Sequence, residues 1–314
     1  MKVIEHLEKA KNPLFSYEIV PPPRGRTVQD IIDIVKALVP YNPPWIDVTA
    51  HSATAFYNEH NDGSIERRVL KKRPGTIGIC GIIQNRFKID TVTHLLCRGF
   101  TKEETEDALL ELGFLGIHNI LALRGDGLNY KKAISKDRTT NEYAVDLVHQ
   151  LKNVNNGEFL DKIPNAGDFN FGIGVASYPE KHFEAPNLKQ DVAYLKEKFE
   201  AGAEYSVTQM FFDNSHYFNF VEKCKEAGIY KPIIPGLKII KSASQLKNIP
   251  RNFYVNFPDG LVDEMMANQN HIKEIGIRHA KNQTRELLEK GVPCVHFYIM
   301  NDTDNVLEVV KEFA

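Results

Sequence analysis

Cysteine and long apolar runs are both scarce in this sequence. Only four of the 314 residues are cysteines, and they are far apart, with no Cys-x-x-Cys pair: Cys80, Cys97, Cys224 and Cys294. This spacing predicts reduced, mostly buried thiols in a cytoplasmic protein, and neither a disulfide framework nor a zinc site. No apolar segment approaches the roughly 20 residues that span a bilayer. Residues 1–11 are charged and lack a signal-peptide core, so we expect neither a membrane span nor secretion.

A large charge of one sign is also absent. The chain has 39 Lys and Arg and 41 Asp and Glu, with a formal net charge of -2 at pH 7. This balance gives no reason to expect a nucleic-acid partner. Walker, His-Glu-x-x-His and Gly-x-Ser-x-Gly motifs are missing, and no metal site is supported. The Gly-Ile-Gly at residues 172–174 runs into Tyr178 and Pro179 instead of a helix, so it does not predict a Rossmann turn.

Strand patterns and helix patterns alternate along almost the whole chain. Eight strand–helix units in one pass, without an internal repeat or a linker, predict a single (β/α)8 TIM barrel over residues 1–314. The strands are expected at residues 14–20, 45–49, 90–96, 120–123, 169–177, 205–210, 232–237 and 294–299.

Four intervening segments need a separate interpretation. Residues 76–87 would suit a strand or a helix, and we favour a helix because residues 90–96 make a better strand. Residues 66–72 are interpreted as a charged helical fragment. Asn141 is expected to cap a helix that runs through Leu151. A longer helical excursion is expected at residues 242–290, ended by Gly291.

The strand at residues 120–123 ends abruptly in Arg124, Gly125 and Asp126. A solvated turn would explain this segment by itself about as well as a ligand site. Polar residues nevertheless recur at the carboxyl ends of nearly all the expected strands, which is where parallel α/β folds bind ligands. The recurrence favours a shared cleft. The strand-end residues are Glu18, Asp47, Thr49, His94, Arg124, Asp126, Tyr178, Thr208, Gln209, Lys238, His296 and Asn301.

Glu18 gives the clearest chemical hint. It lies late in an apolar strand, between Tyr17 and Ile19 and before three prolines. Burial disfavours the charged carboxylate, so we expect a raised pKa and a general acid near neutral pH. The alternative is a structural ion pair with Arg124 or Lys238 across the barrel.

Short motifs occur from about residue 14 to residue 301: S-Y-E-I-V-P-P (16–22), D-V-T (47–49), T-H-L-L-C (93–97), L-A-L-R-G-D (121–126), Y-P-E-K-H (178–182), T-Q-M-F-F-D (208–213), I-I-P-G (233–236) and H-F-Y (296–298). Each is weak alone. Together, and in this order, they closely resemble the methylenetetrahydrofolate reductase family in its short bacterial form.

The resemblance implies a FAD-containing barrel that reduces 5,10-methylenetetrahydrofolate to 5-methyltetrahydrofolate with NADH or NADPH. In the implied ping-pong cycle the nicotinamide reduces the flavin and leaves before the folate binds. The product would supply methyl groups for methionine synthesis. By analogy with bacterial relatives we expect NADH as the reductant, and we expect a homo-oligomer because members of the family assemble.

The resemblance also implies roles for single residues. Glu18 would be the general acid that helps to open the five-membered ring of the folate. Asp126 would lie near the flavin pyrimidine and the pterin, and would be catalytic as well. Gln209 and Gln245 would bind the folate substrate. The positions implied for FAD are Thr49, Ala50, Ser52, His94, Arg124, Gly125, Asp126, Tyr143, Ala144, Tyr178, His182, Ala185, Asp191 and Lys198.

The chain departs from the family after H-F-Y, where an asparagine is commonly followed by an arginine that would grip the glutamate carboxylate of the folate. Here Asn301 is followed by Asp302, which has the wrong charge. Another cation would have to replace the arginine, and Lys238, Lys241 and Arg278 are the candidates.

Two other functions stay open. Lys238, at the end of the seventh strand, could be the Schiff-base nucleophile of a TIM-barrel aldolase. A catalytically silent barrel could bind folate or act as a scaffold, although the presence of Glu18, Asp126 and Gln209 argues against it.

Overall fold

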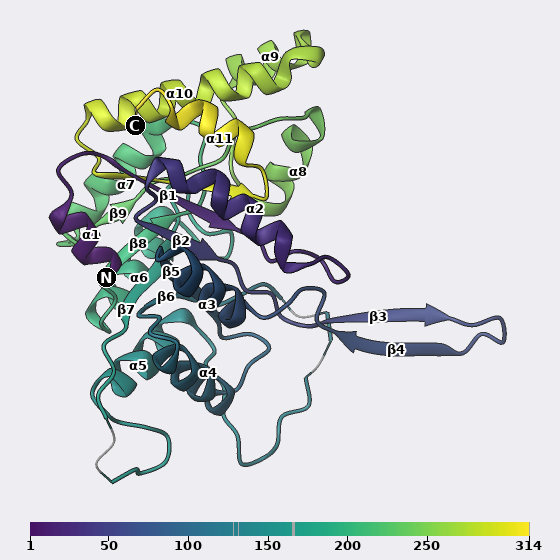
Figure 1. The fold of residues 1–314 in the computed structure, drawn as a ribbon. Coiled ribbons are helices and arrows are strands. Elements are labelled where there is room, and N and C mark those ends of the chain that lie inside the picture. The colour runs from purple at the N-terminus through teal and green to yellow at the C-terminus, as the bar shows by residue number, and fades with distance from the viewer. Residues whose placement is uncertain (128, 131, 165–166, 314) are drawn as a thin grey trace.

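In the computed structural model, parallel strands form a barrel that helices surround (Figure 1). The structure describes residues 1–127, 129–130, 132–164 and 167–313. The strand order is β10-β11-β1-β2-β5-β6-β7-β8-β9. The outermost strands, β9 (Ile233–Ile234) and β10 (Gly236–Leu237), are separated in sequence by Pro235 alone, so they are two halves of one interrupted strand. The sheet therefore closes on itself, which confirms the predicted (β/α)8 barrel.

The barrel strands follow one another along the chain as expected. The remaining strands of the barrel are β1 (Leu14–Ile19), β2 (Trp45–Val48), β5 (Asp90–Leu96), β6 (Asn119–Leu123), β7 (Gly172–Ser177), β8 (Tyr205–Thr208) and β11 (Cys294–Met300). The helices are α1 (Val3–Lys9), α2 (Val28–Leu38), α3 (Thr76–Phe87), α4 (Lys102–Phe114), α5 (Ala144–Asn155), α6 (Leu188–Glu200), α7 (Asn214–Glu226), α8 (Ala243–Phe253), α9 (Asp259–Ala267), α10 (Ile272–Glu289) and α11 (Thr303–Val310), with short 3-10 turns at Val39–Tyr41 and Gln269–His271.

Helix α2 shows how the sequence specifies the outer layer. Thr27 accepts a hydrogen bond from the backbone of Gln29, and Asp30 accepts one from the backbone of Thr27, so the first turn is capped from both directions. Apolar residues then recur at helical spacing and are buried against the strands. These are Ile31, Ile32, Val35 and Leu38.

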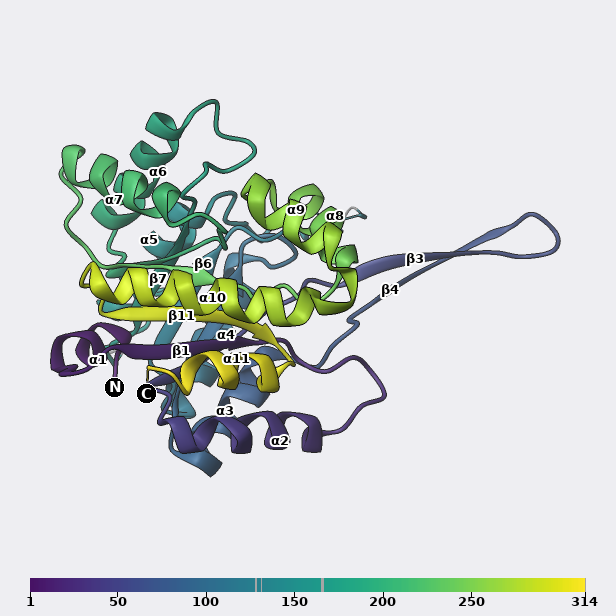
Figure 2. The same cartoon turned by 90° about the horizontal axis from the view of Figure 1, so that it is seen from above.

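The interpretation of residues 66–72 as helical was wrong, because they belong to a β-hairpin. Strands β3 (Thr54–Glu59) and β4 (Ile65–Leu70) pair in antiparallel fashion and project away from the barrel (Figures 1 and 2). Gly63 adopts a φ of 79°, and Asp62 accepts a hydrogen bond from the backbone of Ser64, so the chain reverses at this point. The charged residues that suggested a helix surface are instead the exposed residues of a strand.

A further expectation about helices was wrong, and the helical excursion at residues 242–290 was confirmed. Asn141 does not cap α5: the cap is Tyr143, whose backbone N–H donates to Asp146, while Asn141 donates to Gln150. The excursion at residues 242–290 is divided into α8, α9 and α10, because Tyr254 leaves the helical region with a φ of 57° at the end of α8.

Other expectations were confirmed. Residues 76–87 form helix α3, and all four cysteines are free and buried. Among the described helices, none has both the length and the apolar character needed to cross a membrane.

Gly276 tests how tightly α10 packs on the segment that follows β10. A Cβ at this position would overlap the backbone carbonyl of Ile240. We expect Gly276→Ala to lower the free energy of unfolding by about 1–3 kcal/mol or more, measured by urea denaturation, because backbone must move to make room. Gly260→Ala in α9 is the matched control, since a Cβ there meets nothing within 4 Å. Equal stability of the two variants would contradict this packing.

Candidate functional site

A cluster of two carboxylates and two histidines lies inside the barrel, on four neighbouring strands. Glu18 comes from β1, Asp47 from β2, His94 from β5 and His296 from β11, and all four are buried. Alternate residues of a barrel strand point inward, which is why Glu18 and Ser16 share this interior. We call Glu18, Asp47, His94 and His296 the central cluster.

The central cluster is held by close contacts between opposite charges. His94 Nε2 lies 3.3 Å from Asp47 Oδ2 and 3.7 Å from Glu18 Oε2. His296 Nε2 lies 3.9 Å from Glu18 Oε2, and its Nδ1 lies 2.9 Å from Ser16 Oγ. Ser16 is a member that the sequence reasoning missed, although its spacing of two from Glu18 could have identified it.

The raised pKa expected for Glu18 was wrong. Burial does raise the pKa of its carboxyl, but the contact with His296 and the positive charges of His94 and Lys238 lower it by more, so the net shift is downward. Neither proposed ion pair is the direct partner, since Lys238 acts at longer range and Arg124 pairs with Glu184.

The group in the central cluster whose pKa is raised is His94, not Glu18. Burial lowers the pKa of the imidazole, but the hydrogen bond to Asp47 and the charges of Glu18 and Asp47 raise it by more. The net shift is upward, so the imidazolium form is favoured between the two carboxylates. The arrangement favours a proton on the imidazole 3.7 Å from Glu18. No set of three or more His, Cys, Asp or Glu side chains in the described residues is arranged to hold a metal ion.

Arg124, Gly125 and Asp126 follow β6 on the same side of the barrel. Gly125 has a φ of 83°, a conformation that residues with a Cβ rarely adopt. The Arg124 guanidinium carbon lies 4.7 Å from the centre of the Tyr143 ring, and the guanidinium pairs with Glu184. Arg124 is thus fixed by partners from two loops, whereas Asp126 is exposed.

A third group lies between β7 and α6. Asp191 Oδ2 accepts a hydrogen bond from the backbone N–H of His182 at 2.6 Å, and the His182 ring is 4.7 Å from the Tyr178 ring. Lys198 Nζ donates to the carbonyl of Ala176 at 2.7 Å. Burial lowers the pKa of Lys198 to about 8, although Asp191 opposes this effect. A desolvated ammonium with this few partners is suited to bind an anion.

The central cluster and the other strand-end residues share one mouth. Burial and the charge of Arg73 lower the pKa of His51, while the charges of Asp126 and Glu18 oppose this shift, so both carboxylates lie near the same imidazole. The Tyr298 hydroxyl donates to the carbonyl of Thr208, next to Gln209, at 2.5 Å. Glu18 also acts on the pKa of Tyr298, which burial raises.

The remaining expected site residues lie around this mouth without forming the central cluster. Thr49 and Ala50 directly follow β2, Ser52 Oγ donates to the carbonyl of Arg98, and Ala144 is the first residue of α5. Lys181 donates to the carbonyl of Ala185. The side-chain oxygen of Gln209 accepts from the backbone of Met210, and that of Gln245 accepts from the backbone of Lys241.

Comparison with known proteins identifies the family of this chain. A family model for methylenetetrahydrofolate reductase matches residues 2–314. The chain belongs to the methylenetetrahydrofolate reductase family. It is 30% identical over 301 residues to the 5,10-methylenetetrahydrofolate reductase of Buchnera aphidicola subsp. Baizongia pistaciae. The matched region covers 94% of this chain and 90% of that relative. The similarity to the short bacterial members is thereby confirmed.

Longer members of the methylenetetrahydrofolate reductase family match over only part of their length. The chain is 28% identical over 315 residues to the probable methylenetetrahydrofolate reductase (NADPH) of Caenorhabditis elegans, covering 99% of this chain and 44% of that relative. The chain therefore spans less than half the length of this relative.

A solved structure supports the fold. It is described as an uncharacterized protein from Clostridium thermocellum that binds two copies of 5-methyl-5,6,7,8-tetrahydrofolic acid. It superposes with a TM-score of 0.58 and 13% sequence identity, covering 98% of this chain and 96% of that chain. At this identity the likeness concerns the fold alone.

The raised pKa of His94 predicts a pH dependence of stability. Its contribution is fully present below the unfolded pKa of roughly 6.5 and is lost as the pH rises through the higher folded pKa. Between pH 6 and 9 we expect the free energy of unfolding to fall more steeply in the unchanged protein than in Asp47→Asn, which removes the charge that holds the proton. Asp107→Asn, on the exposed face of α4, should keep the original slope. Identical slopes for all three proteins would refute the assignment.

Proposed function

We propose that this chain reduces 5,10-methylenetetrahydrofolate to 5-methyltetrahydrofolate with a reduced nicotinamide, through bound FAD. Membership in the family supports this reaction, and the central cluster is the observation in the structure that carries it. A proton store lies beside a carboxylate at the mouth of the barrel, where ring opening of the folate needs a proton donor.

The residues around the mouth fit FAD. The side-chain oxygen of Thr49 and the Nε of Arg124 are buried and have no hydrogen-bond partner among the described residues. Lys198 is a desolvated cation close to His182 and Asp191. Orphaned polar groups and a desolvated cation are costly unless a ligand satisfies them.

We assign the parts of FAD to residues on this basis. Arg124, His182 and Lys198 would bind the pyrophosphate, and Tyr178 would contact the cofactor through its ring or hydroxyl. Asp126 would lie near the flavin pyrimidine, together with the backbone of Gly125. FAD would supply the hydride carrier between the nicotinamide and the folate. The further contacts would come from Thr49, Ala50, Ser52, His94, Tyr143, Ala144, Ala185 and Asp191.

The proton step follows from the contacts of Glu18. We assign to Glu18 Oε2 the delivery of a proton to the amine nitrogen that leaves when the five-membered ring opens. His94 Nε2, 3.7 Å away, would restore this proton. A bound folate would exclude water from the carboxyl and raise its pKa, which favours the protonated acid. Gln209 and Gln245 would orient the folate through their amides, and Asp126 would contact the pterin.

NADH is the proposed reductant by analogy with bacterial relatives. The C. elegans relative carries NADPH in its name, so the two nicotinamides need a direct comparison. Anaerobic stopped-flow reduction of the flavin with each nicotinamide separates them, and faster reduction by NADPH would overturn this choice.

The alternative aldolase retains one supporting observation. Burial lowers the pKa of Lys238, as a Schiff-base lysine requires, and its Nζ donates to the carbonyl of Tyr298 at 3.2 Å. Membership in the reductase family outweighs this observation. A colourless protein that borohydride traps together with a carbonyl substrate would favour the aldolase, and a yellow protein that NADH bleaches would favour the reductase.

Lys198→Met tests the proposed FAD site. We expect FAD affinity to fall by about tenfold to a hundredfold, because a charge-assisted hydrogen bond to the pyrophosphate is lost. Titration of the flavin-free protein with FAD, followed by flavin fluorescence, measures the change. Lys196→Met is the matched control, since Lys196 is exposed on the same helix and pairs with Glu200. Equal affinities would show that Lys198 does not contact FAD.

Glu18→Gln tests the proposed acid. The variant should keep its flavin and its oxidation of NADH with an artificial electron acceptor, but lose folate reduction by at least about a hundredfold. Glu204→Gln is the control at the opposite end of the barrel, where the carboxylate pairs with Lys2. Unchanged folate turnover in Glu18→Gln would refute the role of this residue.

A further inference from the structure

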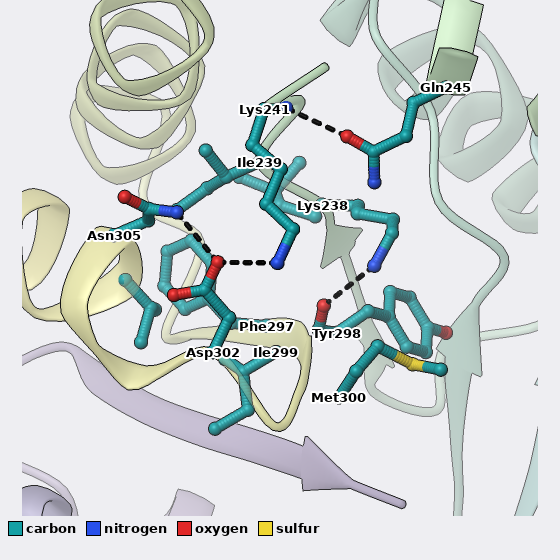
Figure 3. A pocket seen from close by; sticks show the side chains of 12 residues that line it. Lys238, Ile239, Lys241, Gln245, Phe297, Tyr298, Ile299, Met300, Asp302 and Asn305 are labelled. Atoms are coloured by element: carbon teal, nitrogen blue, oxygen red, sulfur yellow. Dashed lines mark hydrogen bonds and ion pairs between the residues drawn. The ribbon is translucent and has the colours of Figure 1, made fainter. Parts of the chain in front are cut away.

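A small cavity lies beside the central cluster, between the end of β10, the end of β11 and helices α8 and α11. Its volume is about 90 Å³. Figure 3 shows Lys238, Lys241, Gln245 and Asp302 around it. Since roughly 10–15 Å³ of such space is enough for one water molecule, the cavity has room for a few waters or for one small polar group such as a carboxylate.

The cavity is connected to the proposed chemistry through its own walls. Tyr298 and Lys238 line it, and the charge of Glu18 acts on both side chains. A substrate whose reacting ring lies at Glu18 can therefore extend toward this cavity. The charged residues of the lining are two lysines and one aspartate, which leaves one excess positive charge for an anion.

The three candidate cations differ in their position relative to the cavity. Lys238 donates to the carbonyl of Tyr298, and the charge of Glu18 acts on its pKa, so it faces the central cluster as well as the cavity. Arg278 pairs with Glu264 at an exposed contact between α10 and α9. Lys241 is the candidate that remains, because it is half exposed and lines the cavity.

Asp302 fixes the position of Lys241. Its Oδ2 accepts hydrogen bonds from Lys241 Nζ at 2.7 Å and from Asn305 Nδ2 at 2.6 Å, as Figure 3 shows. Asn305 belongs to α11, so the aspartate is anchored to a helix and in turn holds the ammonium. An ammonium has three N–H donors, and Asp302 occupies one of them. The other donors of Lys241 remain to bind an anion.

Gln245 adds a second donor to the same cavity. Its Oε1 accepts the backbone N–H of Lys241 at 2.7 Å, which fixes the orientation of the amide. The amide nitrogen then lies on the side of Lys238 (Figure 3). An ammonium and an amide N–H₂ that share a cavity can bind the two oxygens of one carboxylate.

We propose that Lys241, oriented by Asp302, binds the glutamate carboxylate of the folate substrate together with the amide of Gln245. In this chain an acidic residue at position 302 acts as the counter-ion of the binding cation, and does not repel the substrate. Lys241 touches the ligand, and Asp302 is a positioning residue. This inference rests on the proposed reduction of folate and assigns its tail-binding subsite.

A comparison of two substrates separates the loss of the glutamate contact from other effects of a substitution on KM. One is 5,10-methylenetetrahydrofolate, and the other is its pteroate analogue, which has the same ring system but no glutamate. We expect Lys241→Met to raise KM for the folate about tenfold or more and to leave KM for the analogue unchanged, because a hydrogen bond to a charged group is lost only with the folate. Reduction of the flavin by NADH should stay the same. Lys247→Met, on the exposed face of α8, is the control and should change neither KM.

Removal of the charge of Asp302 tests its role in positioning Lys241. Asp302→Asn should raise KM for the folate but not for the analogue, because the ammonium is no longer held at the cavity. Combining Lys241→Met with Asp302→Arg should recover most of the lost discrimination between the two substrates, since a guanidinium is then placed at the cavity from the residue that precedes α11. Recovery of this kind would not follow from a merely structural role of either residue.

The outcomes also distinguish this inference from the proposed function. If Lys241→Met changes KM equally for both substrates, or for neither, the tail subsite is overturned while the reduction of folate stands. If the unchanged protein reduces neither substrate although its flavin accepts electrons from NADH, the proposed function itself fails.

Discussion

The pairing of buried charges in the central cluster is the constraint on which the site depends. A carboxylate or an imidazolium removed from water is costly unless an opposite charge or a hydrogen bond meets it. Glu18, Asp47, His94 and His296 meet this requirement only together, because His94 lies between two carboxylates and His296 faces the same pair. Removal of any member leaves a buried charge with too few partners.

Closure of the barrel brings these charges together. β11 pairs with β1 along its length, so Ser16 and His296, which are 280 residues apart, are in hydrogen-bond contact. β2 and β5 continue the sheet on the other side of β1. The same closure places the end of β10 beside the end of β11, and thus sets Lys238 and Lys241 next to Tyr298 and Asp302. The central cluster and the cavity beside it are therefore two consequences of one topology.

Local sequence patterns predicted the fold well where a single physical rule determines the secondary structure of a segment. Alternating strand and helix signals, and polar residues at strand ends, led to the barrel and to one mouth. The rule failed at the β3–β4 hairpin, where charged residues on an exposed strand resemble a helix surface, and at Asn141, where Asp146 supplies the capping interaction instead. In the first case the pairing of β4 with β3 overrides the helix pattern, and in the second the side chain of Asp146 caps the helix in place of Asn141.

Electrostatics at the site could be predicted only in part. The burial of Glu18 could be inferred from its apolar neighbours, but the direction of its pKa shift could not, because the histidines that reverse the shift come from β5 and β11. In the same way, the sequence showed only that Asp302 has the wrong charge to bind a carboxylate. Its ion pair with Lys241 became evident from the tertiary structure.

The sequence by itself determined the order of the barrel strands, the family and the residue types at the strand ends. Each of these depends on short local motifs. The tertiary structure alone decided the direction in which the pKa values of Glu18 and His94 shift, and which lysine pairs with Asp302. Both depend on Coulomb interactions and hydrogen bonds over a few ångströms, between residues that only the closed barrel makes neighbours.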